Sequence, residues 1–211
     1  YNGARTLPVL TPLLALLLAR RGLAVLVHGT ATESSRVFAS KVLEALGIAS
    51  MSAIEEIAPG RVAFAPTVLL CPGLQRLLEV RRVVGLRNSA HSLVKLMDPV
   101  DARHGARSLI VGSYTHPEYA VSMAEVFALM KSRALLLRGT EGEPVADARR
   151  MPQMDGFIDG RRVRLQEAQT GSLLSLPEVP RECDVASTAA YIQRVMDGAV
   201  PVPAPIAAQV E

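Results

Sequence analysis

Polar residues that could bind an anion follow an apolar run near the start of the chain. Residues 25 to 27 read Val-Leu-Val, and a segment rich in hydroxyl groups separates them from an amphipathic run that ends at Gly47. The polar positions in this segment are His28, Gly29, Thr30, Ser34 and Ser35. Amides and hydroxyl groups at the start of a helix can bind phosphate, because the first amides of a helix have no partner within it. The pattern also fits a strand that simply turns into a helix, and both interpretations stay open at this point.

Arginine side chains occur in adjacent pairs at several places. The pairs are Arg81-Arg82, Arg149-Arg150 and Arg161-Arg162. The formal net charge is +3 and the isoelectric point is near 9.1, which permits an anionic partner without requiring one. Several such pairs beside one groove would bind phosphates, whereas a single pair usually belongs to a solvated surface. The sequence does not establish that the pairs converge.

Other common catalytic and metal-binding patterns are absent from the sequence. The two cysteines, Cys71 and Cys183, form no CxxC pair, and no cysteine-histidine cluster has metal spacing. There is no GxSxG nucleophile, no GxGxxG fingerprint and no Walker loop. We therefore expect a reduced, cytoplasmic protein. The apolar stretch of residues 7–29 is interrupted by prolines and by Arg20-Arg21-Gly22, so we expect no membrane partner.

Strand and helix patterns alternate along the chain. Apolar runs predict buried strands at residues 23–28, 61–65, 108–114 and 133–138, and helical patterns cover residues 12–20, 34–46, 72–84, 88–97, 116–131 and 184–196. Asp159-Gly160, between the segments 154–158 and 161–166, predicts a β-hairpin. The alternation predicts an α/β fold with a mostly parallel sheet and helices on both faces. Ligands of such sheets bind beyond the carboxyl ends of the strands.

Three motifs resemble the anthranilate phosphoribosyltransferase family. Residues 28–47 follow, without a gap, the family's His-Gly, Ser-Ser and Val-Leu-Glu-Ala-Leu-Gly sequence. Residues 80–99, VRRVVGLRNSAHSLVKLMDP, are similar to its Val-Arg-x-x-Leu-Gly-Ile-Arg-Thr-x-Phe-Asn-Leu-Leu-Gly-Pro-Leu-Thr-Asn-Pro, and residues 134–144, ALLLRGTEGEP, to its Ala-Leu-Val-Val-His-Gly-x-Asp-Gly-Leu-Asp-Glu. The likeness extends over nearly the whole chain.

The resemblance implies a fold, a reaction and an assembly. Family members pair a parallel-sheet α/β domain with a small N-terminal helical domain. They transfer a phosphoribosyl group from phosphoribosyl pyrophosphate to anthranilate with magnesium, usually as homodimers. We expect residues 1–211 to form one phosphoribosyltransferase-like α/β domain of a longer chain, because the sequence begins at Tyr1 rather than Met and most of the helical domain would be missing.

Carried over position by position, the resemblance also gives candidate ligand-binding residues. The pyrophosphate loop falls near residues 1–3, the phosphate turn on residues 9–11, and Arg87 stands where the family's arginine grips the anthranilate carboxylate. The full set of candidates is Asn2, Gly3, Arg5, Thr11, His28, Gly29, Thr30, Ser34, Ser35 and Arg87. Val27 and Thr30 replace the lysine and asparagine that flank His-Gly in the family, and His91 replaces an asparagine.

The family's magnesium-binding Asp-Glu pair falls on Pro144-Val145. Magnesium requires oxygen ligands, and neither side chain supplies one. Glu141, Glu143 and Asp147 lie close in the sequence and are the substitutes that a metal would have to use. We therefore assign no catalytic residue and expect no cofactor, with magnesium implied only if the chain is an active transferase.

Two functions of different class follow. The first is a catalytically degenerate phosphoribosyltransferase-like homodimer that binds single-stranded DNA or RNA in a basic groove with little sequence preference. The phrases YNGAR, RNSAHSLVKL and SYTHPEY resemble a branch of the family with that behaviour, and the candidate arginines are Arg81, Arg82, Arg149 and Arg150. The alternative is a phosphoribosyl- or glycosyltransferase with an altered acceptor, which would take a small phosphorylated ligand.

Overall fold

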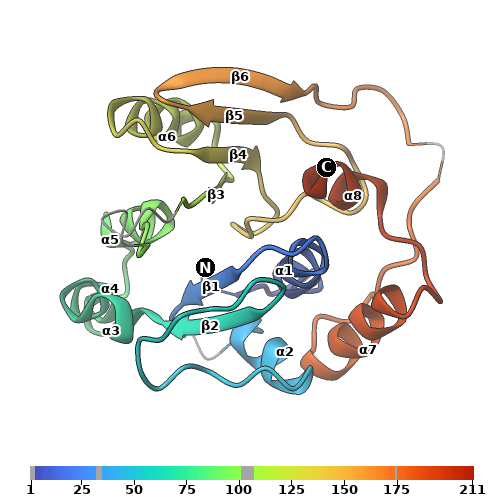
Figure 1. Ribbon diagram of the computed structural model, residues 1–211, viewed down its shortest axis with the longest axis horizontal. Helices are drawn as coiled ribbons and strands as arrows, with labels where there is room; N and C mark the ends of the chain where they lie inside the picture. The colour runs from blue at the N-terminus through green and yellow to red at the C-terminus, as the bar shows by residue number, and fades with distance from the viewer. Residues whose placement is uncertain (1–2, 32–34, 101–106, 174) are drawn as a thin grey trace.

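The structure is a computed structural model that describes residues 3–31, 35–100, 107–173 and 175–211 (Figure 1). Its elements are α1 (Thr11–Arg20), β1 (Val25–Gly29), α2 (Ala39–Ala45), β2 (Val62–Pro66), α3 (Thr67–Leu70), α4 (Pro72–Val84), α5 (Ala90–Leu93), the 3₁₀ turn η1 (Val94–Leu96), β3 (Ile110–Tyr114), α6 (Pro117–Leu129), β4 (Ala134–Arg138), β5 (Met154–Ile158), β6 (Arg161–Gln166), α7 (Val185–Met196) and α8 (Ala204–Val210). Strands and helices alternate through β4, so the predicted α/β class is confirmed.

The strands form two hydrogen-bonded pieces. β1 and β2 pair in parallel, and a four-stranded piece has the order β3-β4-β5-β6. β3 and β4 are parallel, whereas β5 runs antiparallel to β4 and to β6. The predicted hairpin is confirmed: both Asp159 and Gly160 have positive φ, at 51° and 79°, as a type I′ turn requires. In Figure 1 the β1-β2 pair lies below and the four-stranded piece above.

Helices cover both faces of the four-stranded piece, and β4 shows why. Ala134 and Leu136 pack with Phe127 of α6, while Leu135 and Leu137 pack into a second core shared with α1, α7 and α8. Alternate side chains of a strand point to opposite faces, so an unbroken apolar run is what a strand covered on both sides needs. The buried strand predicted at residues 133–138 is thereby confirmed.

The helix predicted at residues 34–46 is shorter than expected. α2 begins only at Ala39, and its N-cap residue Phe38 is extended, with φ −105° and ψ 145°. The cause is a long-range bridge, because Ala4 and Val37 exchange two backbone hydrogen bonds of 2.9 Å. Ser35 therefore lies in a turn ahead of the helix, and the expectation that it sits at a helix start is wrong.

Two further helical segments differ from expectation. The helix predicted at residues 88–97 is only the single turn α5 followed by η1, and the short α3 was not predicted. The longest helices in the described part of the chain, α4 and α6, have 13 residues each. Across the residues that the structure describes, none of the helices has the length and apolar character of a membrane span.

Candidate functional site

The loop that follows β4 lies against the N-terminal segment of the chain. The carboxylate of Glu141 accepts hydrogen bonds from the backbone amides of Arg5, Thr6 and Leu7, at donor–acceptor distances of 3.2 to 3.3 Å. Three consecutive amides directed at one carboxylate form an anion-binding concavity. We call the amides of residues 5–7 the first amide site.

Glu143 makes a second contact of the same kind. Its carboxylate accepts from the amides of Leu10 and Thr11, at 3.0 and 3.1 Å, and from the Thr11 hydroxyl at 2.8 Å. These groups lie at the start of α1, where free amides and the helix dipole favour a negative charge. We call them the second amide site. Glu143 is only 2% exposed, and burial raises its pKa to about 7, against the effect of the hydrogen bonds from Leu10 and Thr11.

The loop itself, residues 139–149, is held by contacts on several sides. Glu141 has a positive φ of 49°, Gly142 one of 86°, and the Glu143 amide donates to the Thr140 carbonyl at 2.9 Å, which closes a tight turn. A side chain at Gly139 would place its Cβ 2.0 Å from the Glu143 carbonyl oxygen.

Neighbouring elements fix the two ends of this turn. The Ser113 hydroxyl, from the end of β3, donates to the Gly142 carbonyl at 3.0 Å. Gln209 of α8 accepts from the Ala146 amide at 2.7 Å and donates to the Pro144 carbonyl at 2.9 Å. The carboxylates of Glu141 and Glu143 are thus presented by a well-anchored loop.

The described residues do not fit the magnesium site that the resemblance implies. Val145 is 1% exposed and packs in the core, and Asp147 forms a bidentate pair with Arg149, at 2.8 and 2.9 Å. Glu141 and Glu143 face amide donors, whose hydrogens point where a cation would have to bind. Within the described ranges, no cluster of three or more histidine, cysteine, aspartate or glutamate side chains could hold a metal ion.

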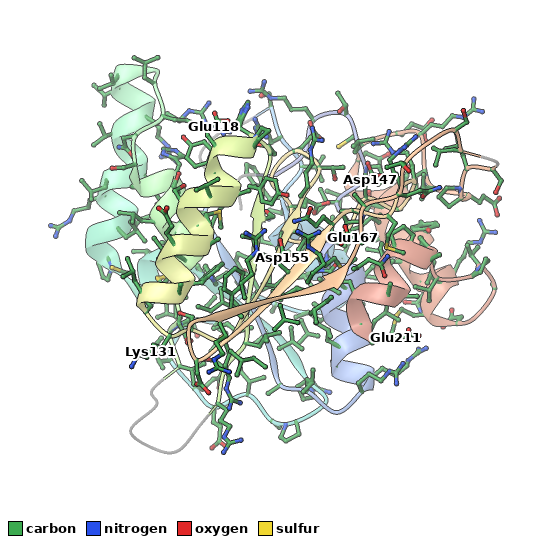
Figure 2. All side chains as sticks on the ribbon, turned by 90° about the horizontal axis from the view of Figure 1, so that it is seen from above. Glu118, Lys131, Asp147, Asp155, Glu167 and Glu211 are labelled. Atoms are coloured by element: carbon green, nitrogen blue, oxygen red, sulfur yellow. The ribbon has the colours of Figure 1, made fainter. Side chains whose placement is uncertain are left out.

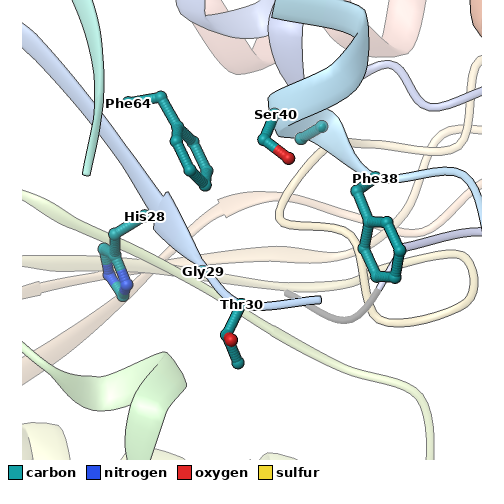
Figure 3. Close-up of a pocket in the computed structure, with 7 residues that line it drawn as sticks. His28, Gly29, Thr30, Phe38, Ser40 and Phe64 are labelled. Carbon is teal, nitrogen blue, oxygen red and sulfur yellow. The ribbon is translucent and has the colours of Figure 1, made fainter. Parts of the chain in front are cut away.

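The turn after β1 contains a small pocket (Figure 3). Its cavity volume is about 20 Å³, and it is lined by His28, Gly29, Thr30, Phe38, Ala39, Ser40 and Phe64. That is room for roughly one water molecule. Burial lowers the pKa of His28 to about 4, so its imidazole is neutral at pH 7. His28, Gly29 and Thr30 thus line this pocket opposite the start of α2.

The remaining N-terminal candidates have structural contacts. Gly3 is buried with φ 77°, and a Cβ there would lie 2.4 Å from the Val37 carbonyl oxygen. Its own carbonyl accepts from the Arg36 guanidinium at 2.7 Å. The Arg5 side chain is exposed while its amide belongs to the first amide site. Asn2 and Ser34 lie outside the described residues.

Arg87 lies after α4, close to a lysine that the sequence did not single out. Lys95 of η1 donates to the Ser113 carbonyl at 3.3 Å. Its Nζ also lies close to Gly142, since a side chain at that glycine would place its Cβ 3.2 Å from Nζ. Burial, and secondly the charge of Arg87, lower the pKa of Lys95 to about 8. A second cation therefore stands with Arg87 at the carboxyl end of β3. The only sequence signal for Lys95 was its place inside the motif of residues 80–99.

The structure does not gather the two predicted arginine pairs into one cluster. Arg82 of α4 donates to the Ala31 carbonyl at 3.1 Å and so reaches the turn after β1, next to the half-buried Arg81. Arg150 donates to the carbonyls of Gln169 and Gly171. In Figure 2, α4 lies at one end of the molecule and Asp147, the partner of Arg149, at the other.

A different basic group forms on the hairpin. Asp155 of β5, with a side chain 3% exposed, pairs with Arg162 and Arg164 of β6, each at 2.7 Å, and its position is labelled in Figure 2. These arginines and Arg138 act electrostatically on Tyr114, whose backbone pairs in register with Arg138 at the end of β4. The hairpin register, Asp155 opposite Arg164, was the signal that could have located this group.

The comparisons with known proteins agree with this architecture. No family model matches the chain. The Escherichia coli protein named Uncharacterized protein YbiB is 37% identical over 212 residues, which cover 96% of this chain and 63% of that protein. Anthranilate phosphoribosyltransferase from Thermus thermophilus is 31% identical over 137 residues, covering 62% of this chain and 39% of the enzyme. The enzyme from Novosphingobium aromaticivorans is 28% identical over 206 residues, covering 93% and 60%.

A solved structure shows the shared fold. The crystal structure of anthranilate phosphoribosyltransferase (TrpD) from Thermus thermophilus matches with a TM-score of 0.67 and 24% identity, covering 99% of this chain and 61% of that chain. Sequence and fold thus relate this chain to the anthranilate phosphoribosyltransferases. The chain spans less than two thirds of the length of each of these relatives, at 63% for YbiB.

Proposed function

We propose that this protein is a catalytically degenerate, anthranilate phosphoribosyltransferase-like protein that binds single-stranded nucleic acid with little sequence preference, as a cytoplasmic homodimer. The observation that carries the proposal is the cationic surface at the carboxyl ends of β3 and β4. It consists of Arg87, Lys95 and Arg138, together with Tyr114. Arg162 and Arg164 of β6, which pair with Asp155 and, for Arg164, also with Glu167, are close enough to act on Tyr114.

This surface has the chemistry that single-stranded nucleic acid needs. Guanidinium groups bind backbone phosphates in a planar, bidentate manner, and an aromatic ring offers a face on which a base can stack. Asp155 fixes Arg162 and Arg164 in place, so less side-chain entropy is lost when a phosphate binds. Exposed Arg138 carries no carboxylate contact among the hydrogen bonds and ion pairs of the described residues.

The loop that carries metal ligands in the family supports the loss of transferase chemistry. Pro144 and Val145 replace the Asp-Glu pair, and Val145 is packed into the core. Stabilisation of the transferring group and of the departing pyrophosphate by metal and charge is the main catalytic contribution in reactions on phosphorylated substrates. A fold that lacks those ligands can keep its surface for binding while losing the reaction.

The test is fluorescence anisotropy of a labelled single-stranded oligonucleotide with the full-length protein at several salt concentrations. Arg138→Ala should weaken binding roughly 3- to 10-fold and reduce the salt slope by about one. Arg133→Ala is the matched control, since Arg133 is exposed just before the other end of the same strand. Binding that is absent at low salt, or equally weakened by both substitutions, would contradict the proposal.

The alternative is a transferase with an altered acceptor, favoured by the pocket at His28, Gly29 and Thr30 and by the position of Arg87. It predicts saturable binding of magnesium phosphoribosyl pyrophosphate. The same titration, repeated with this compound in place of the oligonucleotide, separates the two functions.

A further inference from the structure

We infer that Glu141 and Glu143 are internal ligands that fill the first and second amide sites, so that the loop 139–149 closes these sites to phosphate and pyrophosphate. Closure of the amide sites by these carboxylates is independent of nucleic-acid binding.

The first amide site has every donor occupied by the chain itself. The three amides of residues 5–7 converge on the single carboxylate of Glu141, more than 130 residues away in the sequence. Residues 5–7 belong to no helix or strand, so without this carboxylate these amides would have to bond to water or to another anion. A carboxylate with two oxygens and one negative charge is a small analogue of a phosphate group in this position.

The second amide site is closed more completely. Glu143 satisfies two amides and one hydroxyl at the start of α1 and is itself almost inaccessible to solvent. An external anion would have to displace a buried side chain whose neighbours Pro144 and Ala146 are hydrogen-bonded to Gln209. We therefore expect an external anion to enter at Glu141, whose donors Arg5 and Thr6 are exposed.

The backbone supports a dedicated role for Glu141. It is one of three non-glycine residues with positive φ among those described, at 49°. That conformation costs free energy for a residue with a β-carbon and persists only where the surroundings enforce it. Here it places the carboxylate on the amides of residues 5–7, and the Ser113 and Tyr114 contacts to the loop hold it there.

The carboxylate of Glu141 competes with free anions for the first amide site. Removing it should open the first amide site, because three amide donors then lack an acceptor. Wild-type protein should instead bind inorganic pyrophosphate at millimolar concentration no more tightly than its cationic surface alone allows. Oligonucleotide binding, if present, should be equal in both proteins, since the cationic surface is formed by other residues.

The experiment is isothermal titration calorimetry of the full-length protein with inorganic pyrophosphate, without and with magnesium. Glu141→Ala should bind pyrophosphate roughly tenfold or more tightly than wild type. Glu55→Ala, which removes an equal charge from an exposed loop between α2 and β2, is the matched control and should behave like wild type. Equal affinity of wild type and Glu141→Ala, or a gain in Glu55→Ala of the same size, would overturn the inference.

Hydrogen exchange of the wild type keeps the inference testable if Glu141→Ala does not fold. The amides of Arg5, Thr6 and Leu7 should exchange slowly without any ligand, and pyrophosphate should leave their rates unchanged. Exchange as fast as in an unbonded loop, or slowing on addition of pyrophosphate, would show that the carboxylate does not hold the site.

Discussion

The loop after β4 and the turn after β1 both follow the carboxyl end of a parallel strand, yet they satisfy their polar groups in opposite ways. The loop 139–149 is bonded to the N-terminal segment, to β3 and to α8. In the turn after β1, Nδ1 of His28 is buried and has no hydrogen-bond partner among the described residues. A small cavity of about 20 Å³ borders each region, so the two regions differ in how their polar groups are bonded and not in the space they leave.

The two regions also bury opposite kinds of titratable group. Glu143 is an acid whose pKa is raised to about 7, and His28 is a base whose pKa is lowered to about 4. Burial disfavours the charged form in both cases. Glu143 nevertheless has three hydrogen-bond donors, because the start of α1 supplies two amides and a hydroxyl, whereas the described residues supply no partner to Nδ1 of His28. The contrast indicates that the loop after β4 is built around its carboxylates.

The largest effect should come from a side chain in the loop after β4. Gly139→Ala would bring a Cβ within 2.0 Å of the Glu143 carbonyl oxygen and 2.9 Å of Ser113 Cβ. Since both neighbours are held by hydrogen bonds, we expect a loss of about 3 kcal/mol in the free energy of unfolding, measured with urea.

Gly73→Ala provides the control for this substitution. Gly73 lies in the first turn of α4 with ordinary φ, and a Cβ there has no atom within 4 Å. This variant should be neutral or more stable by roughly 0.5 kcal/mol, because alanine favours the helix. If Gly139→Ala were as stable as Gly73→Ala, the loop would be free to move and the contrast between the regions would fail.

The second-largest effect concerns pH: Glu143 and His28 should contribute to the free energy of unfolding with opposite pH dependence. Folded Glu143 binds a proton more tightly than it does in the unfolded chain, so its contribution falls as the pH rises from about 4.5 to about 7. Folded His28 binds a proton less tightly, so its contribution rises with pH between about 4 and 6.5. Each contribution is worth up to roughly 3 kcal/mol, and in the wild type they largely cancel.

Single substitutions should separate the two slopes. Relative to wild type, Glu143→Gln should gain stability as the pH rises through this window, and His28→Asn should lose it. Urea unfolding of the three proteins between pH 4 and pH 8 measures both differences. Parallel profiles for all three would show that neither group titrates differently in the folded and unfolded states.

Local patterns sufficed for much of the fold. The hairpin followed from Asp159-Gly160, because two residues with positive φ select that turn. The buried strand β4 followed from its apolar run, since both faces carry helices. α2 was predicted five residues too long at its start, because the bridge between Ala4 and Val37 overrides the helical preference of residues 34–38.

The site was less accessible to sequence reasoning. Its central contacts join residues 5–11 to residues 141–143, and no local pattern reports a pairing over that separation. The motif comparison marked both segments but offered Glu141 and Glu143 only as substitute ligands for a metal, since the sequence gives the carboxylates without showing the amides that face them. Lys95 and Arg164 were missed for a similar reason: their roles depend on neighbours brought close by the sheet.

The smallest effect distinguishes one hydroxyl in each region. Thr11→Val removes the group that donates to Glu143 at 2.8 Å and leaves a buried carboxylate with one donor fewer, so we expect a loss of about 1–2 kcal/mol. Thr30→Val makes the same chemical change beside the His28 pocket, where the Thr30 hydroxyl forms none of the hydrogen bonds recorded among the described residues, and should stay within roughly 0.5 kcal/mol of wild type. Urea unfolding at pH 7 measures both changes in stability.

Pyrophosphate titration of Thr11→Val adds a second comparison. Because Glu141 still closes the first amide site in this variant, the variant should bind no more pyrophosphate than wild type. If Thr11→Val alone opened the site to pyrophosphate, Glu143 rather than Glu141 would be the residue that excludes external anions.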